Sequence, residues 1–336
     1  MVAKQGKTLQ KSILVTGGAG YIGSHVVKQL GLRNESIVVL DNLSTGFADS
    51  VLYGELIVGE TGDQALVSRI LAEKNIDTVI HFAAHTIVPE SVTNPLKYYK
   101  NNTSSTQSLL DCCEQAGVSN FIFSSTAAVY GELKTGVATE DSEKAPINPY
   151  GKSKLMSEWM IGDLCAATEM NSVILRYFNV AGSDPDGQIG QRTKNATLLI
   201  KVACEAAVGK REKLYVFGTD YPTPDGTGIR DYIHVDDLAS AHLAALDYLR
   251  AGGESTTLNC GYGHGYSVRE VIDAVERCHD CKLNVIESPR RAGDPPILIS
   301  NADAIHRSLS WQPKFDDLDA IVKTSLAWEM KISGEL

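Results

Sequence analysis

The feature that most constrains the fold is a strand, glycine turn and helix near the start of the chain. A β-rich run at residues 12–16 leads into Gly17, Gly20 and Gly23, and a helical pattern of apolar residues follows. Glycines in this context let the backbone approach a pyrophosphate at the positive end of the helix, and the last one allows close packing of helix on strand. The turn therefore predicts a dinucleotide site, with a glycine spacing that differs from the common G-x-G-x-x-G pattern.

The next strand, residues 36–40, ends in Asp41. A carboxylate there accepts hydrogen bonds from an adenosine ribose and repels a 2′-phosphate. No arginine or lysine follows within residues 42–46. The sequence therefore favours NAD over NADP.

Strand and helix patterns then alternate along the chain. Strands are expected at 55–58, 78–82 and 120–124, and helices at 63–74 and 98–117. Such repeats give a parallel sheet with right-handed crossovers and helices on both faces, so we predict a doubly wound, mostly parallel α/β fold. A later buried run, 256–260, is expected to rejoin this sheet.

Small and hydroxyl-bearing residues follow two of these strands. Ala83 and Ala84 come after the strand that ends at Phe82, and Ser124 and Thr126 end the strand that begins near residue 120. The carboxyl ends of parallel strands meet at one sheet edge, where open α/β sheets bind ligands. Taken alone, a hydroxyl cluster at a strand end is more often a turn than a catalytic group.

The segment Asn148–Lys154 carries a tyrosine and a lysine four residues apart. Pro149 suits the first turn of a helix, which would place Tyr150 and Lys154 on one face. A tyrosine base must have its pKa lowered from ~10 by about three units, roughly 4 kcal/mol. One lysine rarely supplies that much, so a second cation, such as an oxidised nicotinamide ring, is expected nearby. Without the glycine turn, an exposed helix start would be the simpler interpretation.

Composition excludes several classes of partner. The chain of 336 residues has a net charge of -10 with no basic block, which argues against nucleic acid. No apolar run approaches the ~20 residues of a membrane span, and residues 1–10 are expected to form a flexible tail. The seven cysteines are scattered, as expected in a reducing cytoplasm. Cys278 and Cys281 form a single C-x-x-C, so we expect helix residues and no metal site.

Together, the glycine turn, Asp41, the 124–126 hydroxyls and the Tyr150/Lys154 pair resemble the extended short-chain dehydrogenase/reductase family, and within it the UDP-glucose 4-epimerases. The similarity runs from Lys11 to about Met330 and includes residues 77–82, 121–131, 149–156, 176–179, 221–235 and 289–294. It implies a Rossmann sheet at 11–178 and a smaller C-terminal UDP-sugar-binding lobe at 179–336, with about 229–260 returning to the main sheet. It also implies a homodimer joined through the helices at 98–117 and 149–168.

The resemblance further implies roles for individual residues. Tyr150 would be the general base and acid, Lys154 would bind the nicotinamide ribose and lower the tyrosine pKa, Thr126 would hydrogen-bond the sugar hydroxyl, and Ser124 would line the pocket. NAD would be held by Gly17, Gly20, Tyr21, Ile22, Gly23, Asp41, Asn42, Phe82, Ala83, Ala84, Asn101, Ser124, Tyr150, Lys154 and Tyr177. The UDP-sugar would be held by Thr126, Asn179, Leu199, Tyr215, Phe217, Arg230, Arg291 and Asp294. Independently of the family, two arginines suit a bidentate clamp on a diphosphate.

The implied activity is isomerisation of UDP-galactose and UDP-glucose through a 4-keto sugar, as in galactose metabolism. Two departures from the family pattern imply weaker retention of NAD. Glu60 stands where many relatives have an aspartate next to the adenine, and Thr86 stands where relatives often have a lysine that reaches the NAD phosphates. Leu198 replaces an asparagine of some relatives near the substrate phosphates, and Leu298 replaces a pocket-narrowing tyrosine, so UDP-N-acetylhexosamines or UDP-pentoses are alternative substrates.

Two other functions are ranked lower. Within the same family, a sugar-nucleotide 4,6-dehydratase or a decarboxylase would need an acidic side chain in the two positions after Thr126, where this chain has Ala127 and Ala128. A non-catalytic NAD-sensing protein is the second, since a fold does not fix a function. It would be expected to have lost part of the Thr126, Tyr150 and Lys154 set, which is complete here.

Overall fold

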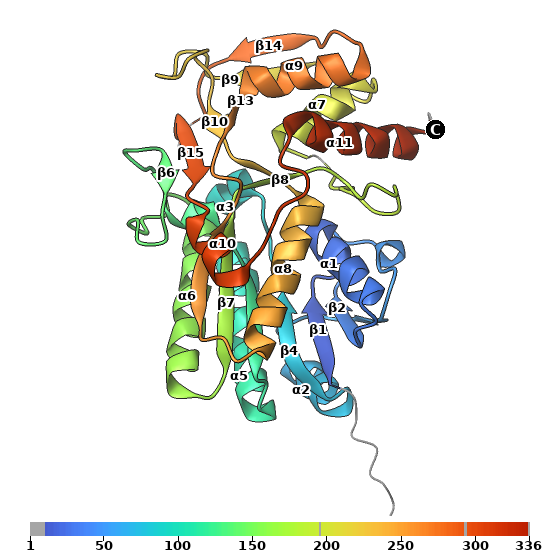
Figure 1. Ribbon diagram of the computed structural model, residues 1–336, viewed down its shortest axis with the longest axis vertical. Coiled ribbons are helices and arrows are strands. Elements are labelled where there is room, and N and C mark those ends of the chain that lie inside the picture. Colours follow the sequence, from blue (N-terminus) through green and yellow to red (C-terminus); the bar gives the residue numbers. More distant parts are fainter. Residues whose placement is uncertain (1–10, 195, 292–293, 335–336) are drawn as a thin grey trace, which may run out of the picture.

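The computed structural model describes residues 11–194, 196–291 and 294–334, so the expected tail at 1–10 lies outside the described residues. Its centre is a seven-stranded parallel sheet in the order β12-β7-β5-β4-β1-β2-β3 (Figure 1). The strands are β1 (Ser12–Thr16), β2 (Ile37–Asp41), β3 (Glu55–Val58), β4 (Ile76–His81), β5 (Asn120–Thr126), β7 (Asn171–Tyr177) and β12 (Thr256–Cys260). The predicted return of the 256–260 strand to this sheet is confirmed.

Helices cover both faces of the sheet. Ile13 and Val15 of β1 belong to an apolar cluster with α1 (Tyr21–Leu32) and α8 (Val235–Arg250). Leu14, pointing to the other face, belongs to a cluster with residues of α2 (Gln64–Glu73), α5 (Ser105–Ala116) and α6 (Pro149–Ala167). Successive side chains of a strand point to opposite faces of the sheet, so a strand whose residues are all buried packs against helices on both faces. The predicted doubly wound α/β fold is confirmed.

Above the sheet in Figure 1 lies a smaller group of C-terminal elements. Its helices α7 (Leu199–Ala207), α9 (Val268–His279) and α11 (Leu318–Ser333) share one apolar cluster. Its strands form three small sheets: β13-β10-β15-β6, β11-β8 and β14-β9. They span β6 (Val137–Ala138), β8 (Asn179–Ala181), β9 (Leu214–Phe217), β10 (Ile229–Arg230), β11 (Tyr232–His234), β13 (Tyr266–Ser267), β14 (Val285–Ser288) and β15 (Ile297–Ser300). The boundary at residue 178 stays a prediction.

The expected single helix at 98–117 is wrong in its first third. The chain forms α3 (Val88–Thr93), α4 (Pro95–Tyr98), a π-helical segment Tyr99–Ser104 and only then α5. Within the π segment, the Asn102 amide donates to the His85 carbonyl and to Ser153 Oγ, and accepts from the His85 backbone N–H. A widened turn that meets such tertiary partners cannot be read from helical periodicity.

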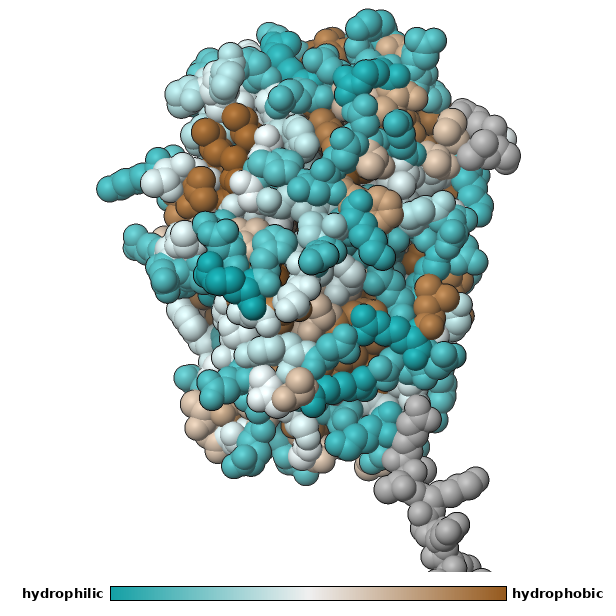
Figure 2. Space-filling view, viewed as in Figure 1, coloured by the Kyte–Doolittle hydropathy of each residue, from teal (hydrophilic) through white to brown (hydrophobic). Residues whose placement is uncertain are grey.

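Smaller elements complete the chain: 3-10 turns at Ala48–Ser50 and Ala127–Val129, and α10 (Asp303–Leu309). Cys281, expected in a helix, lies beyond the end of α9 at His279. Figure 2 shows a face on which hydrophilic residues dominate and hydrophobic ones are scattered in small groups. Within the described parts of the chain, no helix has the length and apolar character needed to cross a membrane.

Candidate active site

The glycine turn lies against the end of β4. Gly17 has a φ of +71°, and a Cβ placed on it would lie 2.6 Å from the backbone N of Ala83. A Cβ on Gly23 would lie 2.3 Å from the Gly17 carbonyl oxygen, so both positions require glycine. Gly20 caps α1, which begins at Tyr21 and includes Ile22. The structure thus builds a cradle of bare backbone at a helix N-terminus, beside Ala83.

Asp41 shapes this turn from the end of β2. Its carboxylate accepts from the backbone N–H groups of Ala19, at 3.0 Å, and Leu43, at 2.8 Å. Burial raises the pKa of Asp41, and the two backbone hydrogen bonds oppose that rise. The neighbouring Asn42 amide donates to the Glu60 carboxylate at 3.1 and 3.2 Å. The Glu60 carboxylate is therefore held beside the end of β2 by its hydrogen bonds with Asn42.

Tyr150 and Thr126 meet where β5 ends and α6 begins. Pro149 occupies the first turn of α6, and the Asn148 side chain caps it by accepting from the Gly151 N–H at 2.8 Å. Burial raises the pKa of the Tyr150 phenol, while a hydrogen bond with the Thr126 side chain lowers it. In the protein alone, the pKa therefore moves opposite to the direction that a tyrosine base requires.

Lys154 lies one turn further along α6 and is 2% exposed. Its Nζ lies 4.4 Å from the ring centroid of Phe123, a cation–π distance. Burial lowers the pKa of Lys154 to about 7, and Glu158 opposes that shift. Ser124, also predicted for this site, shares a short hydrogen bond with the Tyr177 hydroxyl. The Tyr177 pKa is raised by burial and also by the charge of Tyr150.

A buried polar network behind Lys154 was not predicted. The Glu158 carboxylate accepts from Arg176, with Nη2 at 2.6 Å, and from Ser125. Arg176 also donates to the Tyr130 hydroxyl at 3.0 Å. These bonds tie β5, α6 and β7 together directly behind the candidate catalytic side chains. The available signal was spacing, because Glu158 follows Lys154 by four residues on the same helix.

The other predicted cofactor residues come from separate elements, with Phe82 directly after β4 and Tyr177 at the end of β7. Phe82 packs its ring 4.7 Å from that of His242, on α8, and the Tyr177 ring lies 6.2 Å from the same histidine. His242 Nδ1 donates to the Leu238 carbonyl, and its buried Nε2 has no hydrogen-bond partner among the described residues. Asn101 lies in the π segment and donates to Asn102. Asn102, which the sequence reading missed, is the residue that fastens this segment to α6.

The predicted substrate residues form a second group on the C-terminal elements. Tyr215 and Phe217 lie half-exposed on β9, and the Arg291 guanidinium lies 4.9 Å from the Phe217 ring centroid. Arg291 donates to Asp294 at 2.8 Å. Arg230 donates to the Ile229 carbonyl, and burial lowers its pKa, with Asp294 opposing. The structure thus brings the two arginines, Asp294 and Phe217 together.

Asn179, Leu199 and Leu298 connect this second group to the sheet. Asn179 starts β8 and its backbone N–H donates to the Asp231 carbonyl at 3.0 Å. Leu199 is the first residue of α7. Leu298, paired with Arg230 across β15 and β10, packs on the apolar cluster that contains Ala127. The expected gate residue therefore lies between the arginines and the end of β5.

Comparisons with known proteins give a consistent result. The family model described as NAD dependent epimerase/dehydratase family matches residues 13–261. A UDP-glucose 4-epimerase of Azospirillum brasilense is 51% identical over 321 residues, covering 95% of this chain and 92% of the relative. A UDP-glucose 4-epimerase of Lacticaseibacillus casei is 44% identical, covering 94% and 96%.

Solved structures are equally similar. A UDP-glucose 4-epimerase from Brucella ovis in complex with NAD has a TM-score of 0.92 and 43% identity, covering 94% of this chain and 98% of its own. A UDP-Glc/GlcNAc 4-epimerase from Campylobacter jejuni has a TM-score of 0.85 and 52% identity, covering 96% and 99%. An epimerase from Bifidobacterium longum in complex with NAD+ and UDP has a TM-score of 0.91 and 36% identity, covering 97% and 100%.

Proposed function

The chain belongs to the NAD dependent epimerase/dehydratase family, and on that premise we propose that it is a UDP-glucose 4-epimerase, an isomerase that interconverts UDP-galactose and UDP-glucose. The observation that carries the proposal is the meeting of Tyr150 and Thr126 at the carboxyl edge of the sheet, with Lys154 one turn away. Identity of 51% over almost the whole chain supports the same reaction.

NAD is the cofactor, and the residues present fit it. The cradle at Gly17 has no room for a Cβ, which suits close approach of a pyrophosphate to bare backbone. Gly20, Tyr21, Ile22 and Gly23 would continue this contact along the start of α1. Asp41 keeps lone pairs beyond its two backbone bonds, and these would accept from the adenosine ribose. Asn42, Phe82, Ala83, Ala84, Asn101, Ser124, Lys154 and Tyr177 would line the rest of the dinucleotide.

The chemistry divides between cofactor and side chains. When bound, NAD would supply an acceptor for the hydride of sugar carbon 4, which is later given back to the opposite face of the 4-keto sugar, and a positive charge beside the phenol. Tyr150 takes the proton from the 4-hydroxyl and later returns it to the 4-keto oxygen, which gives the opposite epimer. Thr126 holds that hydroxyl within hydrogen-bond reach of Tyr150. Lys154 adds a second cation, and with it the phenol overcomes the raised pKa that burial imposes.

The UDP portion would bind to the C-terminal group of residues. Arg230 and Arg291 would clamp the diphosphate, which must stay in place while the hexose turns over. Tyr215 and Phe217 offer aromatic faces for the uracil base of UDP. Asn179, Leu199 and Asp294 would complete the binding site.

A coupled assay tests this proposal. Purified protein supplied with NAD should convert UDP-galactose to UDP-glucose, detected with a UDP-glucose dehydrogenase. Absence of conversion by protein that retains NAD would favour a sensor over an enzyme.

A broader substrate range is a second candidate, favoured by the Leu298 side chain beside Ala127 and by the Campylobacter jejuni UDP-Glc/GlcNAc relative. Leucine leaves more room than tyrosine, so UDP-N-acetylgalactosamine should be accepted. Leu298→Tyr should then lose activity on the N-acetylated substrate at least ~10-fold and keep activity on UDP-galactose, since excluding one group is worth about 1–3 kcal/mol. Equal effects on both substrates would contradict a gating role.

We also propose a homodimer. Leu96 and Trp159 are 77% and 60% exposed, on α4 and α6, and Val92 of α3 and Met156 of α6 are also exposed. Exposed apolar side chains gathered on neighbouring helices mark an interface. Sedimentation should show a dimer that Leu96→Glu with Trp159→Glu converts to a monomer. The matched pair Leu32→Glu with Val58→Glu, on side chains that are each 61% exposed elsewhere, should leave the dimer intact.

The cysteines support a cytoplasmic location. All seven are free thiols in the structure, and burial raises the pKa of Cys113 and Cys260. Thiols of this kind persist in a reducing compartment.

A further inference from the structure

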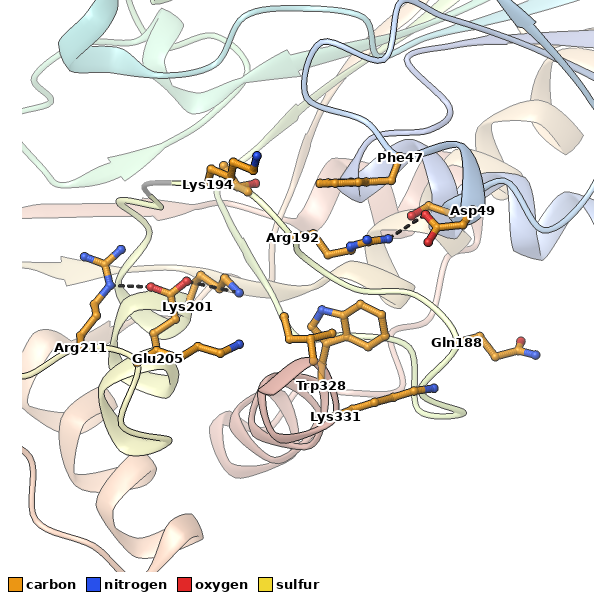
Figure 3. Close-up of a pocket in the computed structure, with 14 residues that line it drawn as sticks. Phe47, Asp49, Gln188, Arg192, Lys194, Lys201, Glu205, Arg211, Trp328 and Lys331 are labelled. Carbon is orange, nitrogen blue, oxygen red and sulfur yellow. Dashed lines mark hydrogen bonds and ion pairs between the residues drawn. The ribbon is translucent and has the colours of Figure 1, made fainter. Parts of the chain in front are cut away.

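A separate pocket of about 860 Å³ lies beside the C-terminal helices, with none of the candidate active-site residues in its lining. Its walls come from the segment after β2, the loop before α7, α7 with the segment that follows it, and α11 (Figure 3). The volume falls within the range of small-molecule sites, roughly 300–1,000 Å³. The pocket is therefore large enough to hold a small molecule.

The lining of this pocket is strongly basic. It holds six cationic side chains and two carboxylates: Arg192, Lys194, Lys201, Lys210, Arg211 and Lys331 against Asp49 and Glu205. Counting Glu329, which accepts from Lys201 and Lys210, the surplus is still three positive charges. The whole chain carries a net charge of -10. A positive pocket on an acidic protein concentrates anions.

The basic groups fall into two sets. Lys201 and Lys210 form the floor of the pocket, and Lys194 and Lys331 belong to its rim. Glu329 is 1% exposed and binds Lys201 and Lys210, so these lysines are held in position. Lys331 donates to the Gly187 carbonyl at 2.6 Å. Among the described residues, neither Lys331 nor Lys194 forms an ion pair with a carboxylate. The rim can therefore turn to a ligand while the floor stays in place.

Arg192 brings the two halves of the molecule together at this pocket. Its guanidinium lies 3.9 Å from the ring centroid of Phe47 and 2.7 Å from the Asp49 carboxylate, which is 71% exposed. In the view of Figure 3, Arg192 lies between the Phe47 ring and the Trp328 indole. A guanidinium stacked on an aromatic ring keeps N–H groups free for a phosphate, and an exposed ion pair exchanges easily.

From this arrangement we propose that the pocket binds an anion carrying two or more phosphate groups, held by Arg192, Lys194 and Lys331 over the Lys201–Glu329–Lys210 floor. Several phosphates match several separated cations better than one does. The site is distinct from the proposed UDP-sugar site, whose Arg230 and Arg291 lie elsewhere on the C-terminal elements.

Calorimetric titration of the NAD-loaded protein with inorganic tripolyphosphate at low ionic strength tests the proposal. Arg192→Gln with Lys331→Gln should weaken binding at least tenfold, and Lys194→Gln, which breaks no ion pair among the described residues, should weaken it severalfold. The matched pair Arg269→Gln with Lys282→Gln removes equal charge elsewhere and should bind as the unmodified protein does. Arg291→Gln should retain this binding.

Two results would overturn the proposal. One is the absence of tripolyphosphate binding to the unmodified protein. The other is binding that Arg291→Gln abolishes and the Arg192/Lys331 variant leaves unchanged, which would assign the phosphates to the proposed substrate site. Epimerase rates separate this test from the proposed function, because neither pocket variant touches the candidate active site.

Discussion

At the scale of single residues, the candidate site is built from groups whose burial opposes their ionisation. Burial raises the pKa of Tyr150 and lowers that of Lys154 to about 7. Both shifts favour a neutral pair, whereas the reaction requires a phenolate beside an ammonium. A cationic cofactor would stabilise the phenolate, and the phenolate would in turn favour the ammonium form of Lys154.

Lys154→Met should make the protein more stable and less active. The Lys154 pKa falls from 10.5 unfolded to about 7 folded, so the unfolded state binds more protons between those values and stability decreases as pH falls from 10.5 to 7. Removing the charge should raise the free energy of unfolding at pH 7 by roughly 3 kcal/mol, measured by urea denaturation, and reduce activity about 100-fold or more. The gain should shrink toward pH 10.

Lys152→Met is the matched control, because Lys152 is exposed on the same helix. It should change neither quantity. A Lys154 variant with reduced stability at pH 7 would show that the ammonium is stabilised by contacts stronger than its burial.

At the scale of elements, the sequence predicts most of the sheet and less of the site. β1 and β3 match their expected bounds, since short β-rich runs between turn residues leave few alternatives. The π segment was missed because Asn102 is held by His85 and Ser153, which are distant in sequence. The Glu158–Arg176 pair was missed for the same reason. The basic pocket was missed because its residues gather only when loops fold together.

Gly17→Ala should damage the contact between the glycine turn and β4. The new Cβ would meet the Ala83 backbone at 2.6 Å, and the φ of +71° disfavours any side chain. We expect a loss of about 3 kcal/mol or more in the free energy of unfolding, and purified protein with little NAD by absorbance.

Gly117→Ala is the matched control that separates the steric overlap of the new Cβ at Gly17 from the backbone cost of a positive φ. Its φ is +68°, but no described residue outside Gly117 and its chain neighbours has an atom within 4 Å of the added Cβ, so only the backbone cost of about 1 kcal/mol remains. NAD content should be unchanged. Equal losses in the two variants would mean that the cradle is not tightly packed.

At the scale of the whole molecule, buried histidines make stability depend on pH. Burial lowers the pKa of His81 to about 3 and those of His234 and His242 to about 4. Unfolded histidines titrate near 6.5, so the unfolded state binds more protons between about pH 4 and 6.5. Stability from these groups is therefore present above pH 6.5 and is lost as pH falls toward 4.

His242→Phe should weaken that dependence. The buried Nε2 of His242 has no partner in the part of the chain that the structure describes, and its ring contacts those of Phe82 and Tyr177, so a phenylalanine ring suits the site. Between pH 7 and 5 the unmodified protein should lose about 2 kcal/mol more unfolding free energy than the variant does. Urea denaturation at the two pH values measures this difference, and parallel losses would contradict a neutral buried His242.

The most direct test of the account is the rate at which Tyr150→Phe interconverts UDP-galactose and UDP-glucose. The variant removes only the hydroxyl that is proposed to carry the proton, so NAD content and melting temperature should match those of the unmodified protein. The rate should fall about 100-fold to 10,000-fold, the range typical of a lost general base. An NAD-loaded Tyr150→Phe protein that epimerises at the normal rate would contradict the central claim.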